Sequence, residues 1–131
     1  MSPLVLRNLV RTALVTSTAV CMLFAGSAGA AELNVSGTWN AVYHCEAGSC
    51  AGQDFPAPGV ELVQAAGSTH VQSGPEVEGT LNGHTLTLAK TSGSYRFSET
   101  LTVSADGNSW SGPLSDSNGT SGTDTATRVS G

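Results

Sequence analysis

The residue with the most chemical potential is an acidic side chain placed within an apolar strand face. Strict alternation along this segment puts Glu99 on the same side as its apolar neighbours. Removal from water disfavours an ionised carboxyl group and raises its pKa, so Glu99 could anchor a ligand or act as a general acid. A β-bulge or an ordinary strand end would instead turn the side chain outward. The neighbours are Tyr95, Phe97, Leu101 and Val103.

A small hydrolase would need Glu99 to act with a histidine. His44, His70 and His84 show neither His-x-His nor His-x-x-x-His spacing, so we expect no metal site. No serine lies in a Gly-x-Ser-x-Gly elbow. We therefore predict no catalytic residues, no cofactor and no enzymatic activity, and we keep the hydrolase as a third hypothesis.

Three aromatic residues are further possible contacts for a ligand or partner, because aromatic side chains dominate binding hot spots. Tyr43 shares a predicted core face with Trp39 and Ala41, so it would line an interior. Phe55 either packs on the core or is offered to a partner. Trp110 has the same two alternatives, of which burial is favoured.

The cysteines predict a disulfide. Cys45 and Cys50 form an even pair in the mature chain, separated by four residues, whereas Cys21 leaves with the N-terminal segment. The spacing is not the Cys-x-x-Cys of thiol oxidoreductases, which argues against a redox enzyme.

Residues 1–30 have the features of an export signal. Arg7 and Arg11 precede an apolar run over 12–25, and the small residues at 28–30 suit a signal peptidase. Cys21 is not placed for lipidation, and the apolar run is too short for a transmembrane helix. We predict a secreted protein with one β domain over residues 31–131 and no membrane association after signal removal.

The mature chain is acidic. Three basic side chains remain against ten acidic ones, a net charge of −7. This balance excludes nucleic acid and anionic membrane surfaces as partners. We expect a monomer that binds an unknown small ligand or an extracellular protein.

The fold class follows from period-two alternation and frequent turn signals. They predict an all-β antiparallel up-and-down meander of about eight short strands closing into a barrel, with a two-sheet β-sandwich as the alternative. Asn82-Gly83 predicts a hairpin turn. The two prolines in 53–59 predict a loop. Strands are expected near 36–44, 60–65, 68–73, 76–82, 84–90, 94–104, 108–115 and 120–129.

The two ends of the domain resemble a known superfamily. Gly37-Thr38-Trp39 opens the first strand and Arg128 lies in the last. This pairing is similar to that of the calycins, which include lipocalins and avidins, where Gly-x-Trp packs beneath an arginine of the last strand. The resemblance implies that Trp39 and Arg128 close one end of a barrel, in which a cation–π contact would help.

We weigh two main functions. The first is a secreted, non-enzymatic β-barrel binding module for a small apolar ligand or an extracellular partner. The alternative is an inhibitor of a secreted enzyme that acts through the loop over 45–59, with Phe55 exposed.

Overall fold

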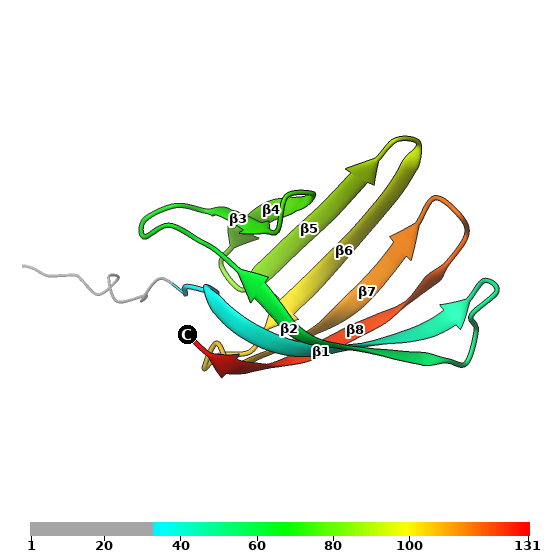
Figure 1. The fold of residues 1–131 in the computed structure, drawn as a ribbon. Coiled ribbons are helices and arrows are strands. Elements are labelled where there is room, and N and C mark those ends of the chain that lie inside the picture. The colour runs from blue at the N-terminus through cyan, green and yellow to red at the C-terminus, as the bar shows by residue number, and fades with distance from the viewer. Residues whose placement is uncertain (1–32) are drawn as a thin grey trace, which may run out of the picture. The chain divides into compact units, whose positions relative to one another are not determined.

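The computed structural model describes residues 33–131, which form one antiparallel sheet (Figure 1). The predicted export signal, residues 1–30, lies outside the described residues. Within residues 33–131, no helix has the length and hydropathy needed to span a bilayer. The strands are β1 (Gly37–Ala47), β2 (Asp54–Leu62), β3 (His70–Ser73), β4 (Val77–Asn82), β5 (Thr85–Ser92), β6 (Tyr95–Val103), β7 (Ser109–Asp116) and β8 (Ser121–Ser130).

The sheet is an up-and-down meander whose first and last strands pair. Across the sheet the order is β2-β1-β8-β7-β6-β5-β4-β3. It curls into a half-barrel, and its two edges meet through one bridge, in which Val63 and Gln72 exchange hydrogen bonds of 2.8 and 2.9 Å. The all-β antiparallel prediction is confirmed, and the strands form a single sheet rather than the two sheets of a sandwich.

Alternation assigns the concave face to the core. Apart from Ala89, the outward side chains of β5 and β6 are exposed hydroxyl and charged groups, as a solvated face requires. Most inward positions are apolar and buried, including Leu86 and Leu101 at 0% exposure. The core comprises Val35, Trp39, Ala41, Leu62, Val71, Leu81, Leu86, Leu88, Leu101, Val103, Trp110 and Ala126.

The prediction of a loop over 53–59 is wrong, because this segment begins β2. Pro56 pairs with Val42 of β1, and β2 is an edge strand with no neighbour on its other side. An edge strand tolerates proline, since the missing N–H is not needed by a second partner. The register shifts near Pro58, where Gly59 N donates to Asn40 Oδ1 at 3.0 Å.

The hairpin predicted at Asn82-Gly83 is present, but its turn is displaced by one residue. Asn82 pairs with Thr85, which leaves Gly83 and His84 as the loop. This register places Leu81 opposite Leu86, and both are buried. Apolar pairing therefore overrides the local preference of Asn-Gly, and His84 becomes exposed rather than joining the core face.

The predicted disulfide joins Cys45 and Cys50 across the β1–β2 turn. Its short loop also holds backbone hydrogen bonds from Cys45 N to Gln53 O and from Gly52 N to Cys45 O, at 2.9 and 2.8 Å. The cross-link thus stabilises the end of an edge hairpin.

Replacing both cysteines by serine is expected to lower the free energy of unfolding by about 2 kcal/mol, because the short loop is no longer closed in the unfolded chain. Urea unfolding of the double variant measures this loss. Ser49→Ala, in the same turn, is the control and should change stability little. Equal stability of the double variant and the control would contradict the prediction.

Candidate functional site

One end of the half-barrel is sealed by an arginine over an indole. Arg128 Cζ lies 4.6 Å from the centre of the Trp39 ring. Its guanidinium donates to the carbonyl oxygens of Ser36 at 2.6 Å, Asn34 at 2.9 Å and Gly107 at 2.7 Å. The pairing expected of Trp39 and Arg128 is thus present, and it ties both chain ends of the domain to the β6–β7 turn.

Trp110 belongs to this sealed end and not to an accessible surface. Its ring stacks on Trp39 with centroids 4.3 Å apart, and the residue is buried. Of the two alternatives for Trp110, the structure supports core packing. A ligand would reach it only by displacing core side chains.

Two buried carboxyl groups lie where this core ends. Glu99 points inward from β6 and is 6% exposed, so neither a bulge nor a strand end turns it outward. Asp124 of β8 is fully buried. Asp124 is paired with Tyr43 of β1 on one side and with Gly112 of β7 on the other. We call Glu99 and Asp124 the carboxyl pair.

Burial changes the acid–base chemistry of this cluster. Desolvation is the largest cause that raises the pKa of Glu99 far above its ordinary value, and hydrogen bonding to Asp124 and the charge of Asp124 add to it. The pKa of the Tyr43 hydroxyl is also raised, first by burial and then by the charges of Glu99 and Asp124. Burial and the neighbouring Asp124 therefore keep Glu99 in its protonated form at neutral pH.

The carboxyl pair lacks donors. Oε1 of Glu99 and both carboxylate oxygens of Asp124 are buried and have no hydrogen-bond partner. Buried polar atoms are nearly always hydrogen-bonded, so three such oxygens in one place call for an explanation. Together these oxygens form a negatively charged group of hydrogen-bond acceptors at the boundary between the core and the open part of the concave face.

The basic residues of the described chain are engaged elsewhere. Arg128 seals the far end, Lys90 pairs with Glu76 at 3.3 Å, and Arg96 is on the exposed outer face. Within residues 33–131, none of these basic side chains forms a salt bridge or hydrogen bond with the carboxyl pair.

The histidines also have other partners. His44 pairs with Asp54, His70 Nε2 lies 3.5 Å from Glu78, and His84 Nδ1 lies 3.1 Å from the Val103 carbonyl oxygen. The hydrolase hypothesis requires Glu99 and a histidine to lie together. The structure does not bring Glu99 together with any of these three histidines.

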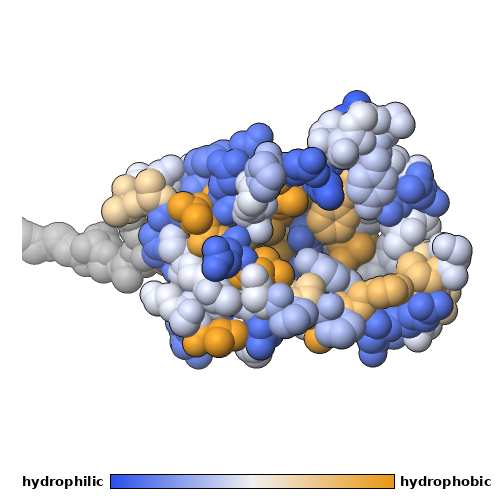
Figure 2. All heavy atoms as spheres, in the orientation of Figure 1, coloured by the Kyte–Doolittle hydropathy of each residue, from blue (hydrophilic) through white to orange (hydrophobic). Residues whose placement is uncertain are grey.

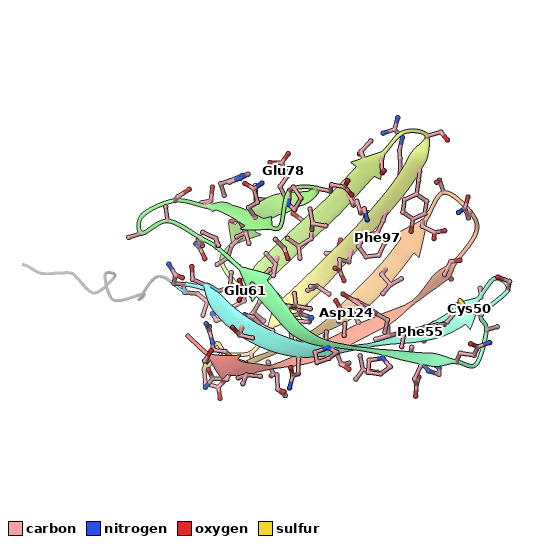
Figure 3. All side chains as sticks on the ribbon, viewed as in Figure 1. Cys50, Phe55, Glu61, Glu78, Phe97 and Asp124 are labelled. Carbon is pink, nitrogen blue, oxygen red and sulfur yellow. A yellow bond between two sulfur atoms is a disulfide. The ribbon has the colours of Figure 1, made fainter. Side chains whose placement is uncertain are left out.

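The concave face opens on the other side of the carboxyl pair. Phe97, Tyr95 and Leu114 point inward there and are only half-buried. Phe97 lies within the curl of the sheet in Figure 3, and Figure 2 shows apolar side chains in the recess between the two sides of the half-barrel. Phe55, opposite Tyr43 at the edge, is 43% exposed. We call these four residues and Tyr43 the open half.

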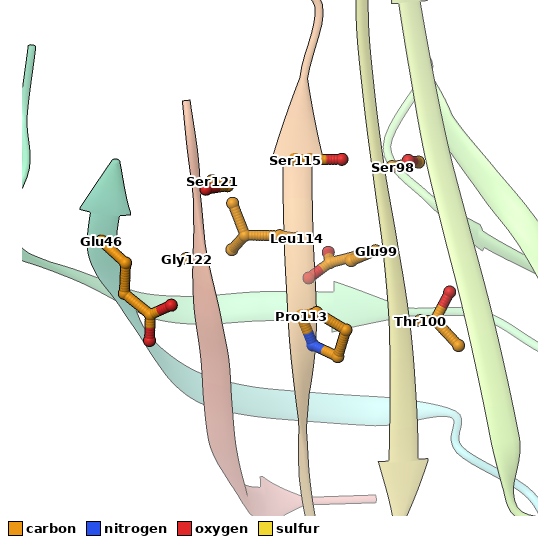
Figure 4. Close-up of a pocket in the computed structure, with 9 residues that line it drawn as sticks. All are labelled: Glu46, Ser98, Glu99, Thr100, Pro113, Leu114, Ser115, Ser121 and Gly122. Atoms are coloured by element: carbon orange, nitrogen blue, oxygen red, sulfur yellow. The ribbon is translucent and has the colours of Figure 1, made fainter. Parts of the chain in front are cut away.

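A pocket of about 390 Å³ lies across β6, β7 and β8 (Figure 4). Ser98, Ser115 and Ser121 are paired in a row along it, and most of these hydroxyl groups face solvent. Pro113 interrupts the β6–β7 ladder here, since proline has no N–H. The other residues that line the pocket are Glu46, Glu99, Thr100, Leu114 and Gly122. Water can hydrogen-bond to these exposed hydroxyl groups. The pocket is therefore weaker evidence for a ligand than the unpartnered oxygens of the carboxyl pair.

Sequence reasoning found Glu99 and Tyr43 but missed Asp124. The sequence did contain a signal for Asp124. Asp124, Ala126 and Arg128 are on the same face of the last strand, and Arg128 was already expected to face Trp39. Antiparallel pairing of Trp39 with Arg128 places Tyr43 opposite Asp124. Register could thus have placed Asp124 on the inward face beside Tyr43, but its approach to Glu99 depends on the curl of the whole sheet.

Comparison of the chain with protein-family models, curated proteins and solved structures found no match. Within residues 33–131, no three His, Cys, Asp or Glu side chains gather closely enough to hold a metal ion. The site is therefore interpreted from its own chemistry.

Proposed function

We propose that the protein is a secreted, non-enzymatic binding module whose concave face takes a small, largely apolar ligand. The observation that carries this proposal is the division of the inward face. One half is a sealed core below the carboxyl pair, and the other half presents Phe97, Leu114 and Phe55 with part of their surface in contact with water. Concave apolar surfaces with a few convergent polar groups are typical ligand sites.

Secretion is part of the same proposal. The export-signal features of residues 1–30 and the Cys45–Cys50 disulfide both suit an oxidising compartment. The resemblance of Trp39 and Arg128 to the closed end of calycin barrels also supports a ligand-binding half-barrel. These two residues seal one end of the sheet, and a ligand could enter from the opposite end.

The inhibitor alternative now rests on a different element. The segment over 45–59 is a disulfide-closed β-hairpin rather than a rigid loop. Phe55 is exposed, as an inhibitor requires, but it lies opposite Tyr43 at the edge of the open half. This position favours contact with a ligand in the recess.

Titration with the neutral fluorophore N-phenyl-1-naphthylamine tests the proposal on protein recovered from the medium of an expression host. We expect saturable binding with increased fluorescence. Phe97→Ala should weaken it about tenfold or more, because most of an aromatic contact is lost. Val42→Ala is the matched control, since Val42 is an apolar residue 40% exposed on the outer face. No binding, or equal effects of the two variants, would contradict the proposal.

A further inference from the structure

We infer that the ligand of the concave face carries a protonated amine, which the carboxyl groups of Glu99 and Asp124 bind while the apolar part contacts Phe97 and Leu114. This inference rests on the proposed function and specifies the chemistry of its ligand. The carboxyl pair contains buried acceptor oxygens to which no group of the described chain donates a hydrogen bond.

The number of acceptors suits an ammonium group. Oε1 of Glu99 and the two carboxylate oxygens of Asp124 are buried without partners. A primary ammonium group has three N–H donors and no acceptor. Hydrogen bonds between ionised groups are shorter and stronger than neutral ones, which favours this occupant over an alcohol.

The charge of the pair also suits a single cation. Because Glu99 is protonated, the carboxyl pair carries one negative charge. The other titratable or charged groups on inward positions of the strands are Tyr43 on β1, Lys90 on β5, Tyr95 on β6, Asp116 on β7 and Arg128 on β8, which is held at the sealed end. Lys90 is held by Glu76, and Tyr95 donates to Asp116 at 3.0 Å, so neither supplies the missing donors.

The surroundings favour an organic cation over a metal ion. Two carboxyl groups provide fewer ligands than Ca²⁺ requires, and no third acidic, histidine or cysteine side chain within residues 33–131 completes a set. Tyr43, which is paired with Asp124, and Phe97, two residues from Glu99 on the same face of β6, are half-buried aromatic residues. Aromatic faces attract ammonium groups, and their apolar surface suits the rest of such a ligand.

Binding would change the proton count of the site. An ammonium group stabilises the ionised form of Glu99, so the proton of Glu99 leaves to the buffer as the amine binds. No bond other than this O–H is broken. Release of up to one proton for each amine bound is therefore a signature that apolar binding alone would not produce.

The test compares n-octylamine, n-octanol and n-octanoate by isothermal titration calorimetry at pH 7 and low salt. These probes share one chain and differ in the head group. We expect octylamine to bind about tenfold or more tightly than octanol, and octanoate to bind most weakly. Titrations in phosphate and in Tris should differ in heat, because the released proton reacts with the buffer.

Two variants and a control locate the effect. Asp124→Asn should reduce the preference for octylamine over octanol to about equal affinity, because the ionised partner is lost. Glu99→Gln should abolish the difference between buffers, since Gln cannot release the proton, and it keeps the test valid if Asp124→Asn fails to fold. Glu61→Gln removes an exposed carboxylate and should leave preference and proton release unchanged.

The outcomes separate this inference from the function on which it rests. Equal affinities for the three probes would overturn the inference and leave an apolar binding module. An amine preference that survives in both site variants would also overturn it, because the amine would then bind elsewhere. If none of the probes binds and the neutral fluorophore also fails, the proposed function is overturned as well.

Discussion

Glu99→Gln is expected to stabilise the protein by about 3 kcal/mol at pH 7, and the gain should grow as the pH rises. In the unfolded chain Glu99 ionises near its ordinary pKa of 4.5, whereas burial and Asp124 raise the pKa in the folded protein. Between these two values the folded state holds the additional proton. The glutamine variant has no such proton to hold.

The sign of the pH dependence follows from this difference. A group whose pKa is raised on folding stabilises the protein fully below its unfolded pKa and loses that contribution as the pH rises. For Glu99 the loss begins near pH 4.5 and is about 1.4 kcal/mol for each pH unit up to the folded pKa. The wild type should therefore lose about 3 kcal/mol between pH 5 and pH 7 from this residue.

Urea unfolding of the wild type and Glu99→Gln at pH 5, 6, 7 and 8 measures the effect. The amide of glutamine can still donate to Asp124, so the variant keeps the contact that a protonated Glu99 makes. Glu61→Gln, an exposed substitution with the same charge change, corrects for general repulsion in this acidic chain. If the free energies of unfolding of the wild type and Glu99→Gln differ by the same amount at all four pH values, the pKa of Glu99 is not raised on folding.

Arg128→Met should destabilise the protein by about 3 kcal/mol, the second large effect. The cation–π contact is worth about 0.5–2 kcal/mol, and hydrogen bonds from a charged donor contribute about 1.5–3 kcal/mol each when they are lost. Methionine keeps apolar contact with Trp39 but leaves the carbonyl oxygens of Ser36, Asn34 and Gly107 without their donor. Losses in such a cluster overlap, so they do not add fully.

Matched variants separate the charge from the hydrogen bonds. Arg128→Lys keeps a positive charge near the indole but cannot reach three carbonyl groups, so we expect a loss between that of Arg128→Met and zero. Arg96→Met, on the exposed outer face, should change the urea midpoint little. If Arg128→Met and Arg96→Met have the same stability, Arg128 does not hold the sealed end together.

The strands and their faces could be predicted because alternation is a local property of the chain. Each run with period two reports its own inward side, as β6 did for Glu99 and Leu101. The disulfide was equally accessible, since Cys45 and Cys50 are close in sequence. The contact of Trp39 with Arg128 joins distant segments, and it was predicted only because the two residues have complementary chemistry and a familiar arrangement.

Two errors arose where the position of a strand in the sheet decides its properties. Prolines in 54–62 are acceptable because β2 is an edge strand, and nothing within those residues indicates that no strand lies beyond it. The turn after Asn82 moved because Leu81 pairs with Leu86. In both cases a neighbouring strand outweighed the local preference.

The sequence by itself determined the all-β class, most of the strand segments, the side of each that faces inward and the disulfide, and it offered burial of Glu99 as one of two alternatives. Only the tertiary structure decided that β2 begins at Asp54 as an edge strand, that the sheet curls without full closure, that Glu99 is buried, and that Asp124 lies close to Glu99 and opposite Tyr43. The physical reason is that alternation is set by each strand's own backbone. Register and curl depend on hydrogen bonds and packing between all the strands, so the carboxyl pair exists only once the sheet has formed.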